Sequence, residues 1–220
     1  PPVEEKPDTK FGLLPPIEFP QGSVSTSNFS YTLNTITGGL PKPGQDEGFE
    51  KIIKVYFVTQ TFATLLAPEK ADALAKKFNI KSSPQILNET RYRYKDQDRS
   101  LLVDLDTGNF AYTKQATLSG NLTPDDGNKL VENFKQLLSN LGILKAELQN
   151  GRDKVTALKT DGGKLIPTSI SSETEAVLIS LWPATLDQKP VLTADFNKSL
   201  VNATVMGTAN QLDNYLSLNF

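Results

Sequence analysis

One tripeptide in the chain has the composition of a catalytic motif. Asp106-Thr107-Gly108 lies between two apolar stretches. In aspartic-type hydrolases, the Asp of an Asp-Thr-Gly tripeptide carries the reactive carboxylate. That chemistry needs two aspartates that face each other and share one proton, and the chain holds one copy of the tripeptide. Dimerisation would supply a second copy, but Asn109 stands where such enzymes usually have Ser, Ala or Thr. A hydrolase using Asp106 is therefore a remote alternative.

The same tripeptide is also explained by a turn between two strands. Leu101, Val103 and Leu105 alternate before it, and Phe110 and Tyr112 follow it. Asp at the start of a turn, and Gly or Asn where φ must be positive, are ordinary hairpin residues. The pattern predicts a hairpin over residues 100–114 that turns at 106–109.

Two further aspartates precede this hairpin. Asp96 and Asp98 lie in the preceding turn, while Asp104 and Asp106 share one face of the expected strand. Together they could bind Ca²⁺, which takes six to eight oxygen ligands. The stretch lacks the EF-hand pattern, so solvated hairpin tips are the favoured interpretation and no metal is predicted.

Two absences restrict the chemistry more than any motif does. The chain contains no Cys and no His. A thiol nucleophile, a zinc–thiolate site and a Ser-His-Asp triad are therefore excluded. We predict that the protein is not an enzyme and needs no cofactor.

The charge pattern restricts the partners. Lys and Arg number 23 and Asp and Glu number 25, for a formal net charge of −2. Nucleic-acid binding depends on clustered cations that face phosphates, and the sequence contains no long basic run. We therefore expect no nucleic acid as a partner.

Three aromatic residues are candidate binding residues. Tyr92 and Tyr94 fall on one face of an expected strand at 86–95, and aromatic residues are enriched at protein interfaces. Trp182, in LISLWPATLDQKPV, either stacks on a sugar or peptide or anchors the end of a strand. The anchor is the favoured interpretation.

The apolar periodicity predicts alternating helices and strands. One helix is expected at 68–80, with Asn79 as a left-handed C-terminal cap, and a second begins with Thr123 as its cap and ends at Gly142. Strands are expected at 29–36, 51–60, 86–95, 154–160, 164–170, 175–182, 189–194, 200–206 and in the final NYLSLNF.

The two expected helices match at a shift of 56 residues. Pro68, Leu74 and Phe78 correspond to Pro124, Leu130 and Phe134. This weak repeat indicates two α+β units, at residues 23–118 and 119–220.

The first residues have a different composition. Residues 1–22 hold six of the fourteen prolines and no Met, which is typical of an extended linker. No stretch reaches the roughly 18–20 apolar residues that a membrane span needs. We expect that a membrane anchor once preceded the linker and was removed. The final NYLSLNF has the pattern of a strand without a stop signal, which is compatible with a natural chain that continues past Phe220.

The stretch PEKADALAKKFNI followed by ETRYRYKDQDRSLLVDLDTGNFAY resembles PepSY-like modules and YycH/YycI-type accessory proteins. In those, a helix precedes a strand pair that ends in a D-x-x-T-G-x-(F/V)-x-Y hairpin. Asn79-Ile80 departs from the Gly-Phe of that pattern. The resemblance covers roughly residues 50–206 and extends to tethered surface proteins of candidate-phylum bacteria.

The resemblance implies an α+β fold of two cystatin- or PepSY-like units, each an antiparallel sheet covered by one helix. It implies a domain at the cell surface or outside the cell, joined to the membrane only through its tether. There it would bind and regulate envelope proteins, with exposed sheet edges or the Tyr92/Tyr94 face as the contact surface. The alternative is a module that binds cell wall or glycan through Trp182 and the tyrosines.

Overall fold

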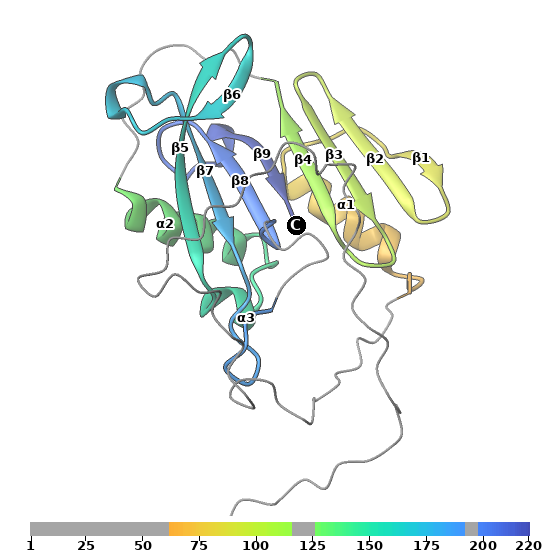
Figure 1. The fold of residues 1–220 in the computed structure, drawn as a ribbon. Helices are drawn as coiled ribbons and strands as arrows, with labels where there is room; N and C mark the ends of the chain where they lie inside the picture. The colour runs from red at the N-terminus through yellow and green to blue at the C-terminus, as the bar shows by residue number, and fades with distance from the viewer. Residues whose placement is uncertain (1–61, 116–125, 192–197) are drawn as a thin grey trace, which may run out of the picture. The chain divides into compact units, whose positions relative to one another are not determined.

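The computed structural model describes residues 62–115, 126–191 and 198–220, which belong to one compact unit, Gln60–Phe220 (Figure 1). The linker and the strands expected at 29–36 and 51–60 lie outside the described residues. Nine strands form one antiparallel sheet in the order β1-β2-β3-β4-β9-β8-β7-β5-β6. The predicted α+β class is confirmed.

The first part of the described chain contains one helix and a four-stranded meander, and the second contains two helices and five strands. The elements are α1 (Ala67–Lys77), β1 (Gln85–Asn88), β2 (Arg91–Asp96), β3 (Arg99–Asp104), β4 (Phe110–Lys114), α2 (Gly127–Asn140), α3 (Ala146–Gln149), β5 (Asp153–Asp161), β6 (Lys164–Pro167), β7 (Ala176–Leu181), β8 (Val201–Val205) and β9 (Tyr215–Asn219), with single 3₁₀ turns η2 (Ser171–Glu173) and η3 (Leu212–Asn214).

Helix α1 ends where the sequence places a left-handed residue. Asn79 has φ 58°, and the Ile80 N–H donates to the Ala75 carbonyl at 3.0 Å, which closes the helix end. The cap prediction is confirmed, but the helix ends at Lys77 instead of at residue 80. The reason is that a positive φ at residue 79 cannot continue a right-handed helix.

Helix α2 begins later than predicted. Its first helical residue is Gly127, and the Leu130 N–H donates to the Asp126 carbonyl at 2.9 Å. Thr123, the predicted cap, lies outside the described residues. The predicted end is confirmed, because Gly142 has φ 70°.

Two strand predictions are wrong. The expected single strand at 86–95 is two strands, because the Asn88 side chain accepts hydrogen bonds from the Thr90 N–H at 3.0 Å and hydroxyl at 3.2 Å and closes a turn. Residues 189–191 of the expected strand at 189–194 are not in a strand. There the chain reverses at Asp187 and Gln188, which both have positive φ.

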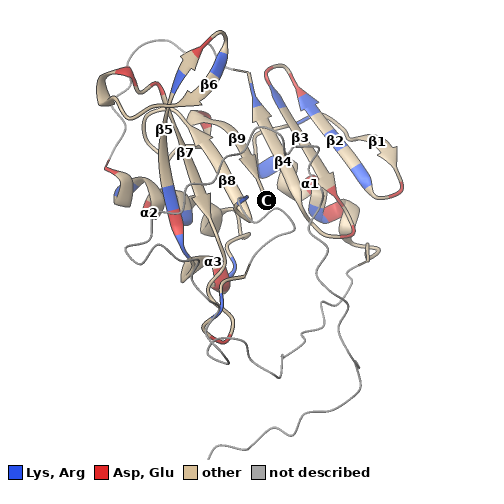
Figure 2. Ribbon diagram, in the orientation of Figure 1, with Lys and Arg blue, Asp and Glu red and all other residues tan. Residues whose placement is uncertain are grey.

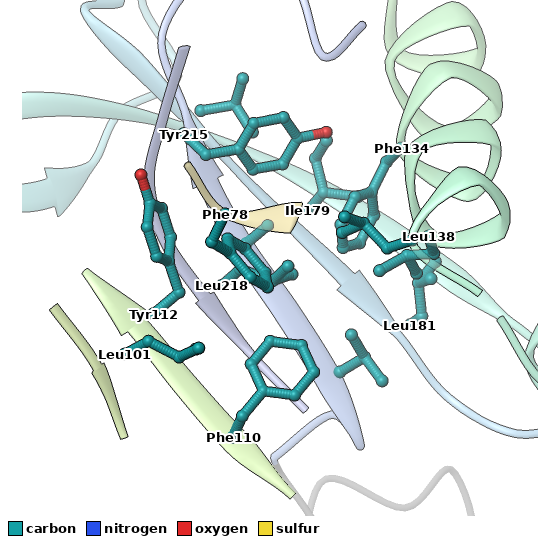
Figure 3. Packing of buried hydrophobic residues seen from close by; sticks show 14 of the residues in the cluster. Phe78, Leu101, Phe110, Tyr112, Phe134, Leu138, Ile179, Leu181, Tyr215 and Leu218 are labelled. Carbon is teal, nitrogen blue, oxygen red and sulfur yellow. The ribbon is translucent and has the colours of Figure 1, made fainter. Parts of the chain in front are cut away.

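Both long helices pack on the same face of the sheet (Figure 1). Phe78 after α1 stacks on Tyr112 of β4, with ring centroids 4.6 Å apart, and Phe134 of α2 packs on Tyr215 of β9 at 5.9 Å. Figure 3 shows these aromatic rings together with the aliphatic residues of β7 and β9 in one continuous core. Side chains of the opposite parity along each strand therefore point away from the helices.

Candidate binding surface

The Asp-Thr-Gly motif forms a turn, as predicted. Its closing residue is Asp104, whose Oδ1 accepts hydrogen bonds from the Thr107 N–H at 3.0 Å and from the Thr107 hydroxyl at 2.9 Å. Gly108 supplies the positive φ of 73°. The Thr107 N–H bond is the main cause that lowers the pKa of Asp104, with the Arg91 charge adding to it. Sequence reasoning missed this role of Asp104.

Asp106 has a structural contact. Its Oδ1 accepts a hydrogen bond from the Ala63 N–H at 2.7 Å and so ties the segment before α1 to the β3–β4 turn. No described contact of Asp106 supports the hydrolase hypothesis.

The four aspartates do not form a cation site. In the β2–β3 ladder Asp96 lies opposite Arg99 at one end of β3, while Asp104 lies opposite Arg91 at the other end. No group of three or more acidic residues suited to a metal occurs in the described part of the chain. The length of β3 therefore separates Asp96 from Asp104, and the four aspartates do not meet at one place.

Tyr92 and Tyr94 share one face of β2, as predicted, but that face packs under α1. Tyr94 is fully buried and donates to Asp72 Oδ1 of α1 at 2.6 Å. Burial, and then this hydrogen bond, raise the pKa of the Tyr94 phenol. Tyr92 is partly buried against the core. The tyrosine pair is thus unsuited to be the contact surface, because the helix already covers it.

Trp182 lies just after β7 and is half-buried. The Arg152 guanidinium lies 4.7 Å from the centre of its indole, and the Trp182 backbone N–H donates to the Arg152 carbonyl at 2.8 Å. Both contacts support the anchor interpretation, because the backbone bond fixes the end of β7 and the guanidinium occupies one ring face that a sugar would use.

Comparisons of the chain with protein-family models, with curated proteins and with solved structures found no match. The resemblance to PepSY-like modules therefore stays a prediction from the sequence. Among the described helices, none has the length and apolarity that crossing a membrane requires.

The first edge strand of the sheet exposes apolar side chains. All four residues of β1 are exposed, including Ile86 at 63% and Leu87 at 40%. None of the four is charged, and the outer edge of β1 pairs with no described strand. Such an edge is a template for another extended chain.

The other edge strand is better protected. β6 begins with Lys164 and ends with Pro167, and its apolar residues Leu165 and Ile166 are half-buried. A charged residue and a proline are common devices that prevent strand addition at an edge. The two edges of the sheet therefore differ, and β1 is the candidate binding edge.

The resemblance implied that an exposed sheet edge is a contact surface, but it did not indicate which strand forms that edge. The signal for β1 was in its composition, since Ile86 and Leu87 are adjacent and so point toward different sides of a strand. An edge strand with apolar residues on both sides cannot bury both against one core.

Proposed function

We propose that this protein is a non-enzymatic binding domain whose β1 edge receives a short extended segment of a partner protein. The observation that carries the proposal is the exposure of Ile86 and Leu87 on an uncharged edge strand. An added strand would bond to the backbone of β1 and remove these side chains from water, and both effects favour association.

The local structure limits how long the bound segment can be. Pro84 precedes β1, and the pairing of β1 with β2 is irregular between Ile86 and Asn88. A bulge and a nearby proline interrupt a ladder of hydrogen bonds. The edge is therefore suited to a short segment and to reversible binding, as in a regulatory contact.

The resemblance supports a setting at the cell surface, where the partner would be an envelope protein and the tether would hold the domain at the membrane. The finer fold, two related α+β units, belongs to the same proposal. It is supported by Phe78 and Phe134, which match at a shift of 56 residues and pack on tyrosines of the neighbouring strands β4 and β9.

The test uses the absence of cysteine from the chain. An Ile86→Cys variant carries one thiol, to which a photo-cross-linker is attached before incubation with envelope extract of the source cells. Illumination followed by mass spectrometry identifies what lies against β1. We expect one dominant protein, cross-linked through an extended segment.

The matched control is Ile170→Cys. Ile170 is 49% exposed and lies in the segment that follows β6, the strand at the opposite edge of the sheet from β1. The proposal requires that the β1 partner is missing from the control and is lost on adding Leu87→Asp. The same proteins from both positions, or slow thiol labelling of the free Ile86→Cys chain, would contradict it. Slow labelling would mean that another segment of the chain already covers this edge.

A further inference from the structure

The strand beside the exposed edge carries a row of cations. Arg91, Arg93 and Lys95 alternate in β2 with the tyrosines. Because Tyr94 is buried under α1, these cations point away from the helices. Figure 2 shows the blue positions along β2 and none on β1. We call Arg91, Arg93 and Lys95 the basic row.

Most of this charge is not neutralised within the described part of the chain. Arg91 reaches Asp104 at 3.8 Å and its side chain is still 59% exposed. Arg93 and Lys95 are exposed and have no ion-pair partner among the described residues. The chain as a whole has a net charge of −2, so the positive row is a local feature.

The row lies next to the edge that binds. Gln85 pairs with Arg93, and Asn88 pairs with Arg91. A strand added to β1 would lie about 10 Å from β2, twice the spacing of neighbouring strands. The uncharged side chains of β1 on that face, Leu87 among them, would separate it from the row. Long Arg and Lys side chains can extend over them toward carboxylates of the added strand.

The opposite side of the same edge is apolar. Ile86 pairs with Tyr92 and so lies on the helix-covered face of the sheet, where it is exposed. A bound strand thus meets cations on one face and an apolar side chain on the other. Because successive side chains of a strand point to opposite faces, the complementary sequence alternates acidic and apolar residues.

We propose that the segment received by β1 is an extended peptide that alternates acidic and apolar residues, with its carboxylates toward the basic row. This inference rests on the proposed binding at β1 and adds the chemistry of the partner. A purely anionic polymer fits less well, since it has nothing apolar to cover Ile86 and Leu87.

The test measures binding of three labelled peptides of about ten residues to the full chain by fluorescence anisotropy. They alternate Val with Glu, with Gln or with Lys. We expect the Glu peptide to bind most tightly and the Lys peptide not to bind. Affinity for the Glu peptide should fall as salt rises from about 0.05 to about 0.5 M, because salt screens exposed charges.

Two pairs of substitutions with equal charge change locate the effect. Arg93→Gln combined with Lys95→Gln should lower the affinity for the Glu peptide by about fivefold, as expected for the loss of two partly exposed charge pairs. Lys154→Gln with Lys164→Gln removes two exposed cations from β5 and β6 and should leave the affinity unchanged. Equal losses in both double variants would overturn the inference.

The outcomes separate this inference from the proposed function. If the Glu and Gln peptides bind equally well and Ile86→Asp abolishes the binding of both, β1 is a binding edge, but the inference that its ligand must be acidic is wrong. If no peptide binds, the inference fails, and the cross-linking test decides separately whether β1 binds a protein. If polyphosphate binds as well as the Glu peptide and ignores Ile86→Asp, the row is a general anion surface and the inference is wrong.

Discussion

Asp104 and Asp106 are two residues apart in one turn, and their side chains have different bonds. The Asp104 carboxylate accepts hydrogen bonds from the Thr107 N–H and hydroxyl, whereas the Asp106 carboxylate accepts one from the exposed Ala63 N–H. We expect Asp104→Ala to lower the free energy of unfolding by about 1–2 kcal/mol, because a carboxylate accepts both bonds. Asp106→Ala should cost less than about 1 kcal/mol, since water can replace its exposed bond. Urea unfolding measures both.

The same residue predicts a dependence on acid pH. The pKa of Asp104 is lowered in the folded protein, so its contribution to stability is present above its unfolded pKa of about 3.9 and is lost as pH falls through the folded value. Below about pH 4, Asp104→Asn should therefore lose less stability than the wild type as pH falls. An identical acid profile would show that the turn does not depend on the ionised carboxylate.

Tyr94 and Tyr112 are both buried, but only one hydroxyl is satisfied. Tyr94 donates to Asp72, while the Tyr112 hydroxyl has no hydrogen-bond partner in the described structure. Tyr94→Phe should therefore cost about 1–2 kcal/mol, and Tyr112→Phe should be neutral or slightly stabilising, because removing an unsatisfied buried polar group removes a penalty. Thermal unfolding of the matched pair measures the difference, and equal losses would contradict it.

Burial raises the pKa of Tyr112 to about 12. Because the unfolded pKa is about 10, the folded state keeps its proton more tightly. The contribution to stability is full below about pH 10 and is lost as pH rises to about 12. Tyr112→Phe should therefore flatten the alkaline loss of stability, and an unchanged slope between pH 10 and 12 would count against this account.

At the scale of elements, the junction between α3 and β5 depends on a glycine. A Cβ on Gly151 would lie 1.9 Å from the Trp182 carbonyl oxygen, whereas a Cβ on Gly127 would meet Val155 side-chain atoms at an ordinary 3.9 Å. We expect Gly151→Ala to destabilise the fold by more than about 2 kcal/mol, because the backbone at Trp182 would have to move to make room for the methyl group.

Gly127→Ala is the matched control at the start of α2. It should be neutral or stabilise the protein by up to about 1 kcal/mol, because Ala favours helix more than Gly does. Circular dichroism with urea titration measures both. A Gly151→Ala protein as stable as the wild type would show that the close approach to Trp182 does not exist in solution.

At the scale of the whole molecule, β4 and β9 join the two parts of the sheet. Arg99 of β3 adds a second connection between the two parts, because it bonds to residues of both. Its Nη2 donates to Asp213 Oδ1 in η3 at 2.7 Å, and its Nη1 donates to the Phe78 carbonyl at 3.4 Å. Phe110 of β4 also stacks on Phe220, with centroids 5.7 Å apart.

This joint predicts cooperative unfolding of the described unit. Arg99→Gln should lower the free energy of opening by about 1–3 kcal/mol and should do so equally for β2–β3 and β7–β8. Hydrogen exchange with mass spectrometry measures both strand pairs in one experiment. Arg93→Gln is the control, because Arg93 is exposed and has no ion pair among the described residues, and it should change neither by more than about 0.5 kcal/mol. Loss of protection in one strand pair alone would contradict a single cooperative unit.

Local signals predicted the parts of the fold that depend on a few neighbouring residues. The left-handed Asn79, the end of α2 at Gly142 and a turn at 106–109 follow from the conformations that each residue type allows. The turn that divides β1 from β2 was missed because it depends on one side-chain bond, from Thr90 to Asn88. An apolar pattern does not report such a bond.

The alternation of helices and strands, and the lack of thiol and imidazole chemistry, can be read without a structure, because periodicity and the absence of Cys and His are local or countable properties. Which face of β2 is covered depends on the packing of α1, which buries Tyr94 and leaves Arg93 and Lys95 exposed. The order of the strands makes β1 an edge and leaves Ile86 exposed. Exposure depends on contacts between residues far apart in the chain, and no local pattern contains them.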